Sequence, residues 1–156
     1  MACRAALPLL VVWLQLAASG AAAAATEPVE GLWVTSNFAS VVELTRCEAS
    51  LCAELAWLWD VGVANRRKLD EENPDERLRG RPMIGLSLFE RFRRDGEGWK
   101  GRIYNPEDGR TYRATLVQRN RNVLRLRGCY GPFCRSQTWR RLGSFTLPTP
   151  ADLGRR

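Results

Sequence analysis

The fold is decided by residues 122–142, which read NVLRLRGCYGPFCRSQTWRRL. Apolar and polar residues alternate on both sides of Cys129 and Cys134, and a Gly-Pro pair lies midway between the cysteines. Alternation with period two predicts β-strands, and glycine with proline predicts a tight turn. The stretch is therefore predicted to form a β-hairpin whose cysteines face each other across an antiparallel ladder, close enough for a disulfide.

This pairing divides the side chains of the hairpin between two faces. The face that carries the cysteines is polar and holds Arg125, Arg127, Ser136, Thr138 and Arg140. The opposite face holds Leu124, Leu126, Gln137 and Trp139. We expect the polar face and its disulfide to lie outside, and the apolar face to lie inside with Arg135 and Gln137 as polar exceptions.

A second cysteine pair, Cys47 and Cys52, predicts a similar hairpin earlier in the chain. Direct pairing of these cysteines places Thr45 opposite Glu54 and Glu43 opposite Ala56 on the outer face. The inner face then holds Val42, Leu44, Ala53, Leu55 and Trp57. Both hairpins thus indicate an apolar interior and disulfides on the exterior.

Short alternating stretches separated by turn residues continue along the chain, a pattern typical of a β-sandwich or β-barrel. The predicted strands are Gly31 to Ser36, Ser40 to Arg46, Cys52 to Trp59, Gly85 to Arg93, Trp99 to Tyr104, Arg110 to Gln118, Asn122 to Cys129 and Cys134 to Leu142. Their alternation adds Leu86, Leu88, Phe92, Trp99, Ile103, Tyr112, Ala114 and Leu116 to the interior. The polar connection from Asp60 to Pro82 is long enough to predict a functional lid or mobile loop.

The amino terminus has the composition of an export signal: a basic start, an apolar run and an alanine-rich end. We predict a signal peptide over residues 1–25, a barrel domain over 26–145 and a flexible tail over 146–156. An uncleaved membrane anchor is the alternative for the first segment. Removal of Cys3 with the signal leaves four cysteines, which predicts two disulfides in an oxidising compartment, periplasmic or extracellular.

Composition restricts the possible chemistry. The chain of 156 residues contains no histidine, which excludes Ser-His and Cys-His catalysis and histidine-ligated metals. The acidic cluster Asp70, Glu71, Glu72, Asn73, Asp75 and Glu76 lacks the spacing of a calcium loop and is interpreted as a solvated loop. We predict no catalytic residues, no cofactor, no metal and no enzymatic activity.

A series of motifs along the mature chain carries a family resemblance. It consists of Gly31 and Trp33; Cys47 with Leu51-Cys52; Asn73-Pro74; Leu78, Arg79, Arg81-Pro82 and Gly85; Ile103 to Gly109 with Thr111-Tyr112; and Gly128 with Ser136 to Trp139. This series resembles the bacterial domain-of-unknown-function family 2147, an exported lipocalin-like family. The resemblance implies an eight-stranded antiparallel up-and-down barrel with one long loop between strands 3 and 4. It implies no settled activity.

The opening Gly31-Leu32-Trp33 is also similar to the Gly-x-Trp motif of lipocalins. In that family the tryptophan fills the closed end of the barrel, and an arginine from the last strand covers it. The resemblance, together with strand alternation, implies that Trp33 and Arg141 form this barrel-closing pair.

An up-and-down barrel that starts at its closed end brings the 60–82 connection, the 105–109 turn and the end of the cysteine hairpin to the opposite rim. This rim would be the mouth of the barrel. The candidate ligand-binding residues below it are Trp57, Trp99, Ile103, Tyr112, Arg135, Gln137 and Trp139. We predict a small apolar or amphipathic ligand, although these side chains would equally suit a filled core.

Charge is divided along the chain. Residues 26–90 carry seven basic and twelve acidic residues, whereas residues 91–156 carry sixteen basic and five acidic residues. Lys100, Arg102, Arg113, Arg125 and Arg127 are predicted to form a basic outer face. The alternative function is therefore an envelope-associated interaction protein with a filled core that docks on anionic surfaces. A simple role in solubility would also explain these charges, and we expect neither a nucleic-acid partner nor an integral membrane protein.

Overall fold

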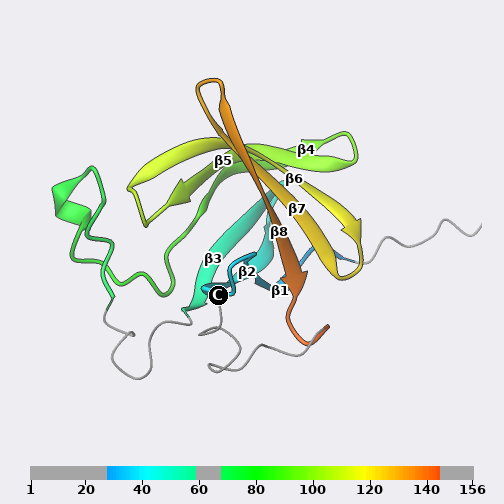
Figure 1. The fold of residues 1–156 in the computed structure, drawn as a ribbon, viewed down its shortest axis with the longest axis horizontal. Coiled ribbons are helices and arrows are strands. Elements are labelled where there is room, and N and C mark those ends of the chain that lie inside the picture. The colour runs from blue at the N-terminus through cyan, green and yellow to red at the C-terminus, as the bar shows by residue number, and fades with distance from the viewer. Residues whose placement is uncertain (1–27, 59–67, 145–156) are drawn as a thin grey trace, which may run out of the picture.

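The computed structural model describes residues 28–58 and 68–144, and these form one closed antiparallel barrel (Figure 1). Its strands are β1 (Gly31–Val34), β2 (Ser40–Cys47), β3 (Ser50–Leu58), β4 (Phe89–Asp95), β5 (Gly98–Asn105), β6 (Arg110–Asn120), β7 (Val123–Tyr130) and β8 (Phe133–Arg141). Each strand pairs with the next, and β1 closes the barrel on β8 through Trp33 opposite Arg141 and Val34 opposite Arg140. The expected up-and-down barrel is confirmed. The predicted signal peptide and tail lie outside the described residues.

The β7–β8 hairpin has the predicted register. Cys129 lies opposite Cys134, their Cα atoms are 4.1 Å apart, and the two sulfurs form a disulfide. Gly131 occupies the turn with a φ of 57°, a left-handed conformation that glycine adopts without strain. The leucines and Trp139 of this hairpin are buried, and its outer arginines are exposed.

The predicted register of the other hairpin is wrong by two residues. Cys47 lies opposite Ser50 and Thr45 lies opposite Cys52, because the turn holds only two residues. The disulfide between Cys47 and Cys52 still forms, diagonally across the ladder, with a Cα–Cα distance of 5.8 Å. A shift of two residues keeps the side chains between the turn and Leu55 on their predicted faces.

Two β-bulges change the alternation elsewhere. The β2–β3 register shifts between Val41 and Val42, and Trp57 beyond the shift is 43% exposed instead of lying inside as expected. In β4 the shift lies between Glu90 and Arg93, and it brings both Phe89 and Phe92 into the interior, where their rings stack at 3.8 Å. A bulge inserts one residue into a strand, so the side chains beyond it exchange faces.

Strand β4 also starts later than predicted. The residues before it, 86–88, hydrogen-bond individually to both neighbouring strands: Leu88 N donates to Ala53 O, and Tyr104 N donates to Leu88 O, each at 2.8 Å. This segment follows Gly85, whose φ of 84° redirects the chain toward β4. The described part of the preceding connection holds the short 3-10 helix η2 (Glu76–Leu78), and no helix within the described ranges is long and apolar enough to span a membrane.

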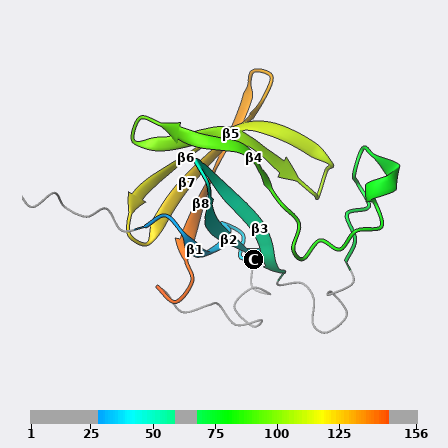
Figure 2. The ribbon, with the colours of Figure 1, turned by 180° about the vertical axis from the view of Figure 1, so that it is seen from behind.

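The closed half of the barrel is a packed core. Its least exposed large side chains are Trp33, Trp139, Phe92, Leu44, Leu51, Leu116 and Leu124. At this end the β2–β3, β4–β5 and β6–β7 turns gather, while the remaining connections lie at the opposite end (Figure 2). Because the core fills only the closed half, the open half is available for a cavity.

Candidate functional site

A cavity of about 710 Å³ occupies the open end of the barrel. Its wall is formed by residues of β2, β3, β5, β6, β7 and β8 and of the connections β1–β2, β3–β4 and β5–β6. The apolar side chains in its wall are Leu55, Leu58, Met83, Leu88, Ile103, Leu126 and Trp139. Leu55, Leu88, Leu126 and Trp139 are buried strand or strand-flanking residues that form its base. Polar side chains lie nearer the mouth, so the cavity has an apolar base and a polar entrance.

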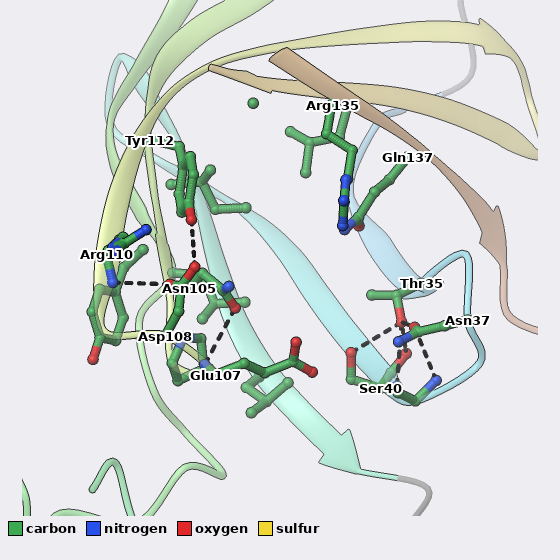
Figure 3. A pocket seen from close by; sticks show the side chains of 18 of the residues that line it. Thr35, Asn37, Ser40, Asn105, Glu107, Asp108, Arg110, Tyr112, Arg135 and Gln137 are labelled. Carbon is green, nitrogen blue, oxygen red and sulfur yellow. Dashed lines mark hydrogen bonds between the residues drawn. The ribbon is translucent and has the colours of Figure 1, made fainter. Parts of the chain in front are cut away.

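Strand β8 supplies two inward polar side chains, Arg135 and Gln137, which project into the cavity side by side (Figure 3). Their position follows from the hairpin register, in which Arg135 lies opposite Gly128 and Gln137 opposite Leu126. The Oε1 atom of Gln137 accepts a 3.1 Å hydrogen bond from Nε1 of Trp139. Within the described part of the chain, Arg135 forms no ion pair. Its guanidinium is therefore a cation available at the mouth.

The β5–β6 turn forms the facing side of the mouth. The Tyr112 hydroxyl donates a hydrogen bond to Asp108, and Arg110 N donates to the other carboxylate oxygen at 3.0 Å (Figure 3). The bond to Asp108 raises the pKa of the Tyr112 hydroxyl because it stabilises the protonated form. Glu107 reaches toward the cavity from the same turn (Figure 3). This side of the entrance carries two carboxylates and the cation Arg110, whereas the β8 side carries Arg135 without a carboxylate.

The β1–β2 connection is a third part of the rim, which the sequence reasoning missed. Thr35 Oγ1 and Ser40 Oγ are 3.1 Å apart, and Asn37 Oδ1 accepts a 3.2 Å hydrogen bond from Ala39 N. All four residues line the cavity. Their signal in the sequence is a polar run directly after the first strand, which the up-and-down order places at the open end.

The predicted ligand-binding residues fall into two groups. Ile103, Tyr112, Arg135, Gln137 and Trp139 line the cavity together. Trp57 and Trp99 are not among the lining residues. Trp99 is buried in the closed half instead, where the guanidinium groups of Arg46 and Arg94 lie 4.8 and 5.2 Å from its ring centre.

The described part of the connection before β4 is anchored to the barrel by Asp70 and Asn73, which are buried, contrary to the expected solvated loop. Glu71, Glu72 and Glu76 of the same cluster are exposed, as expected. Asp70 is fully buried, and its carboxylate accepts hydrogen bonds from Tyr104 Oη at 2.6 Å, Asn73 Nδ2 at 2.7 Å and Arg81 Nε at 2.9 Å. Nη2 of Arg81 lies 2.8 Å from the same carboxylate. Burial of an ionised carboxylate is costly unless it is paired in this way, so the cluster holds the described part of the loop, from residue 68 onward, against the barrel.

The same connection touches the β5–β6 turn. A Cβ atom placed on Gly109 would lie 1.8 Å from the carbonyl oxygen of Glu72, and Gly109 has a φ of 67°. Only glycine permits both this close approach and this backbone conformation. The contact joins the loop to the rim of the cavity at the turn that carries Glu107 and Asp108.

At the closed end, Arg141 covers Trp33. The guanidinium carbon of Arg141 lies 4.3 Å from the Trp33 ring centre, and its nitrogens donate hydrogen bonds to the carbonyl oxygens of Pro28, Glu30 and Arg121 at 2.7 to 2.9 Å. This geometry is the one that the lipocalin resemblance implied. It ties the residues before β1 to the last strand and to the β6–β7 turn.

The predicted basic face is exposed. Lys100, Arg102, Arg113, Arg125 and Arg127 all lie on the outside of β5, β6 and β7. Arg102 lies opposite Arg113, and Arg127 lies opposite Thr115 in the ladder. One of these cations is paired weakly: Arg102 Nε lies 3.5 Å from Glu90 at a solvent-exposed position. The five basic residues therefore share the exterior of three adjacent strands, with Thr115 between Lys100 and Arg127.

A closed eight-stranded barrel with a packed base, an arginine-covered tryptophan and an open mouth defines a lipocalin-like protein. Over residues 31–141 the chain matches the family described as "Uncharacterized protein conserved in bacteria (DUF2147)", and it belongs to that family. A solved structure described as "Protein HP1028 from the human pathogen Helicobacter pylori belongs to the lipocalin family" is similar, with 26% sequence identity and a TM-score of 0.67. The similarity covers 76% of this chain and 86% of the other. Comparison with curated proteins finds no match.

Proposed function

We propose that this protein is an exported, non-enzymatic barrel that binds a small amphipathic ligand in the cavity at its open end. The observation that carries the proposal is the combination of an apolar base and a cationic side chain, Arg135, in one cavity of about 710 Å³. The two disulfides support a periplasmic or extracellular location, because such bonds persist in oxidising compartments.

The arrangement of charges favours one orientation of the ligand. An apolar chain would pack on the leucines and Trp139 at the base, and a polar or anionic head would lie against Arg135 and Gln137. Glu107 and Asp108 on the facing turn would repel an anionic head, so the head belongs on the β8 side. The open cavity weighs against the alternative of a filled barrel.

Displacement of an environment-sensitive apolar dye tests this proposal, with dodecanoate and dodecanol as the competing probes. The two probes share a chain and differ in the charge of the head. We expect dodecanoate to bind more tightly, and Arg135→Gln to weaken dodecanoate about tenfold while leaving dodecanol unchanged. Arg140→Gln, an exposed arginine on the outer face of the same strand, is the matched control.

A second variant tests the location of the ligand. Gly128 lines the cavity, and a Cβ atom there would lie 3.6 Å from Tyr112, an ordinary contact. Gly128→Leu should therefore narrow the cavity next to Tyr112 and weaken dye binding, whereas Gly128→Ala should retain it. Unchanged binding by Gly128→Leu would place the ligand elsewhere, and failure of both probes to displace the dye would contradict the proposed ligand class.

A further inference from the structure

The β7–β8 hairpin ends in an exposed apolar tip, defined here as Tyr130, Pro132 and Phe133. The hairpin projects beyond the neighbouring strands at the open end (Figures 1 and 2). Phe133 is 80% exposed and Tyr130 is 56% exposed, the largest values for bulky apolar side chains within the described residues. The Cys129–Cys134 disulfide lies directly behind the tip and braces it. Tyr130 also packs edge-on against Tyr112, with ring centres 5.9 Å apart, whereas the exposure of Phe133 is not explained by packing of the barrel.

Arginines lie near this tip, and acidic residues are absent from β6, β7 and β8. Residues 110–141 include nine arginines, Arg110 and Arg141 among them, and no aspartate or glutamate occurs between Asp108 and Asp152. The guanidinium of Arg110 lies 5.5 Å from the ring centre of Tyr130. Arg113 lies opposite Cys129, one ladder position behind the tip, so its position is about 3 Å further back along the strand.

An anionic lipid bilayer would accommodate both the exposed aromatic rings of the tip and the arginines near it. Aromatic side chains partition into the headgroup layer of a membrane, and neighbouring arginines are attracted to negatively charged headgroups. A soluble polyanion would engage the arginines but would leave the aromatic rings in water. We propose that the tip inserts into the headgroup layer of an anionic bilayer, with Arg110 and Arg113 contacting the lipid phosphates.

The position of the tip gives this docking a consequence for the cavity. Tyr130 and Phe133 also line the mouth, so insertion of the tip holds the cavity entrance against the membrane surface. An amphipathic ligand could then pass between the bilayer and the barrel without crossing open water. That consequence rests on the proposed function, whereas bilayer binding itself does not, because it is measured without a ligand.

Co-sedimentation with vesicles tests the docking. The protein is exported from a bacterial host, its N-terminus is read by mass spectrometry, and it is mixed with vesicles of phosphatidylcholine alone or of equimolar phosphatidylglycerol and phosphatidylcholine. We expect binding to the anionic vesicles and at least about tenfold weaker binding to the neutral ones. Equal binding to both compositions, or no binding to the anionic vesicles at low salt, overturns the proposal.

Matched variants separate insertion from attraction by charge. Phe133→Ser should weaken binding to anionic vesicles about tenfold, whereas Leu32→Ser, which replaces an exposed apolar residue on β1, should not. Arg113→Gln should weaken binding about fivefold, and Arg119→Gln, at the far end of β6, should have a smaller effect. Unchanged binding by Phe133→Ser, with strong dependence on salt, would indicate a purely electrostatic surface and overturn insertion.

Because a variant that misfolds would also lose binding, one further variant is designed to keep binding and add a fluorescence signal. Phe133→Trp keeps an aromatic ring at the tip and should retain binding. Its additional fluorescence should be quenched by brominated lipids in anionic vesicles, because the ring would lie at headgroup depth. Binding without any quenching of the added signal overturns insertion, and a failed dye assay with intact vesicle binding would contradict only the ligand proposal.

Discussion

The hydroxyl of Tyr104 donates a 2.6 Å hydrogen bond to Oδ1 of Asp70, and both side chains are buried. The two residues are 34 positions apart in sequence. Tyr104 belongs to β5, whereas Asp70 belongs to the connection before β4, so this bond joins the longest described loop to the barrel wall. Because Tyr104 also lines the cavity, the same contact supports part of the rim.

Asp70→Asn should lower the free energy of unfolding by about 3 kcal/mol. The substitution removes the negative charge that compensates Arg81, and it places an amide donor among groups that already donate hydrogen bonds. Urea denaturation at neutral pH measures the effect. Glu90→Gln, which breaks the exposed 3.5 Å pair with Arg102, is the control and should cost less than about 0.5 kcal/mol. Equal losses of unfolding free energy in the two variants would show that the buried cluster stabilises the fold no more than an exposed ion pair does.

Alkaline pH should destabilise the protein through Tyr104. Burial, followed by the hydrogen bond to Asp70, raises the pKa of Tyr104 to about 12 from an ordinary value of 10. The unfolded chain therefore loses this proton first, and stability present below pH 10 decreases as the pH rises toward 12. Urea denaturation at several pH values measures this slope. Tyr104→Phe should flatten it, and an unchanged slope would contradict the assignment.

Gly109→Ala should be far more disruptive than an alanine at another glycine with positive φ. At Gly109 the new Cβ would meet the carbonyl of Glu72, whereas at Gly96, with a φ of 57°, nothing lies within 4 Å of the new atom. Gly96→Ala thus isolates the backbone strain, about 1 kcal/mol. We expect Gly109→Ala to cost roughly 3 kcal/mol or more, since the loop must move. Thermal unfolding measures the stability of both variants. Similar losses for Gly109→Ala and Gly96→Ala would mean that Glu72 does not contact the β5–β6 turn as closely as the structure shows.

Arg141→Lys should destabilise the closed end although it keeps the charge. Lysine has no planar group to place over Trp33, and it cannot donate to three carbonyl oxygens in the arrangement that Arg141 uses. The expected loss is about 2 kcal/mol, measured by chemical denaturation. Arg140→Lys, at the exposed neighbouring position, should be nearly neutral. An equally neutral Arg141→Lys would remove the argument for a specific barrel-closing contact.

Part of the candidate site followed from alternation alone. The β7–β8 register was predictable because the turn and both cysteines define it locally, and this register turns Arg135 and Gln137 inward. Trp57 was misplaced because a bulge is a local insertion that leaves no mark on the alternating pattern. Trp99 was placed correctly in the interior but at the wrong height, since alternation specifies a face and not a level in the barrel.

The amino-acid sequence by itself determined the approximate positions of the strands, the two outer disulfides and, for most positions, the division of side chains between the two faces. These features depend on neighbours in the chain, through period-two alternation and turn chemistry. Only the tertiary structure decided that the base is filled while the mouth is open, that Asp70 is buried against Tyr104, and that Phe133 projects at the rim. These features depend on how the barrel closes and where the loop docks, and residues far apart in sequence meet only after that closure.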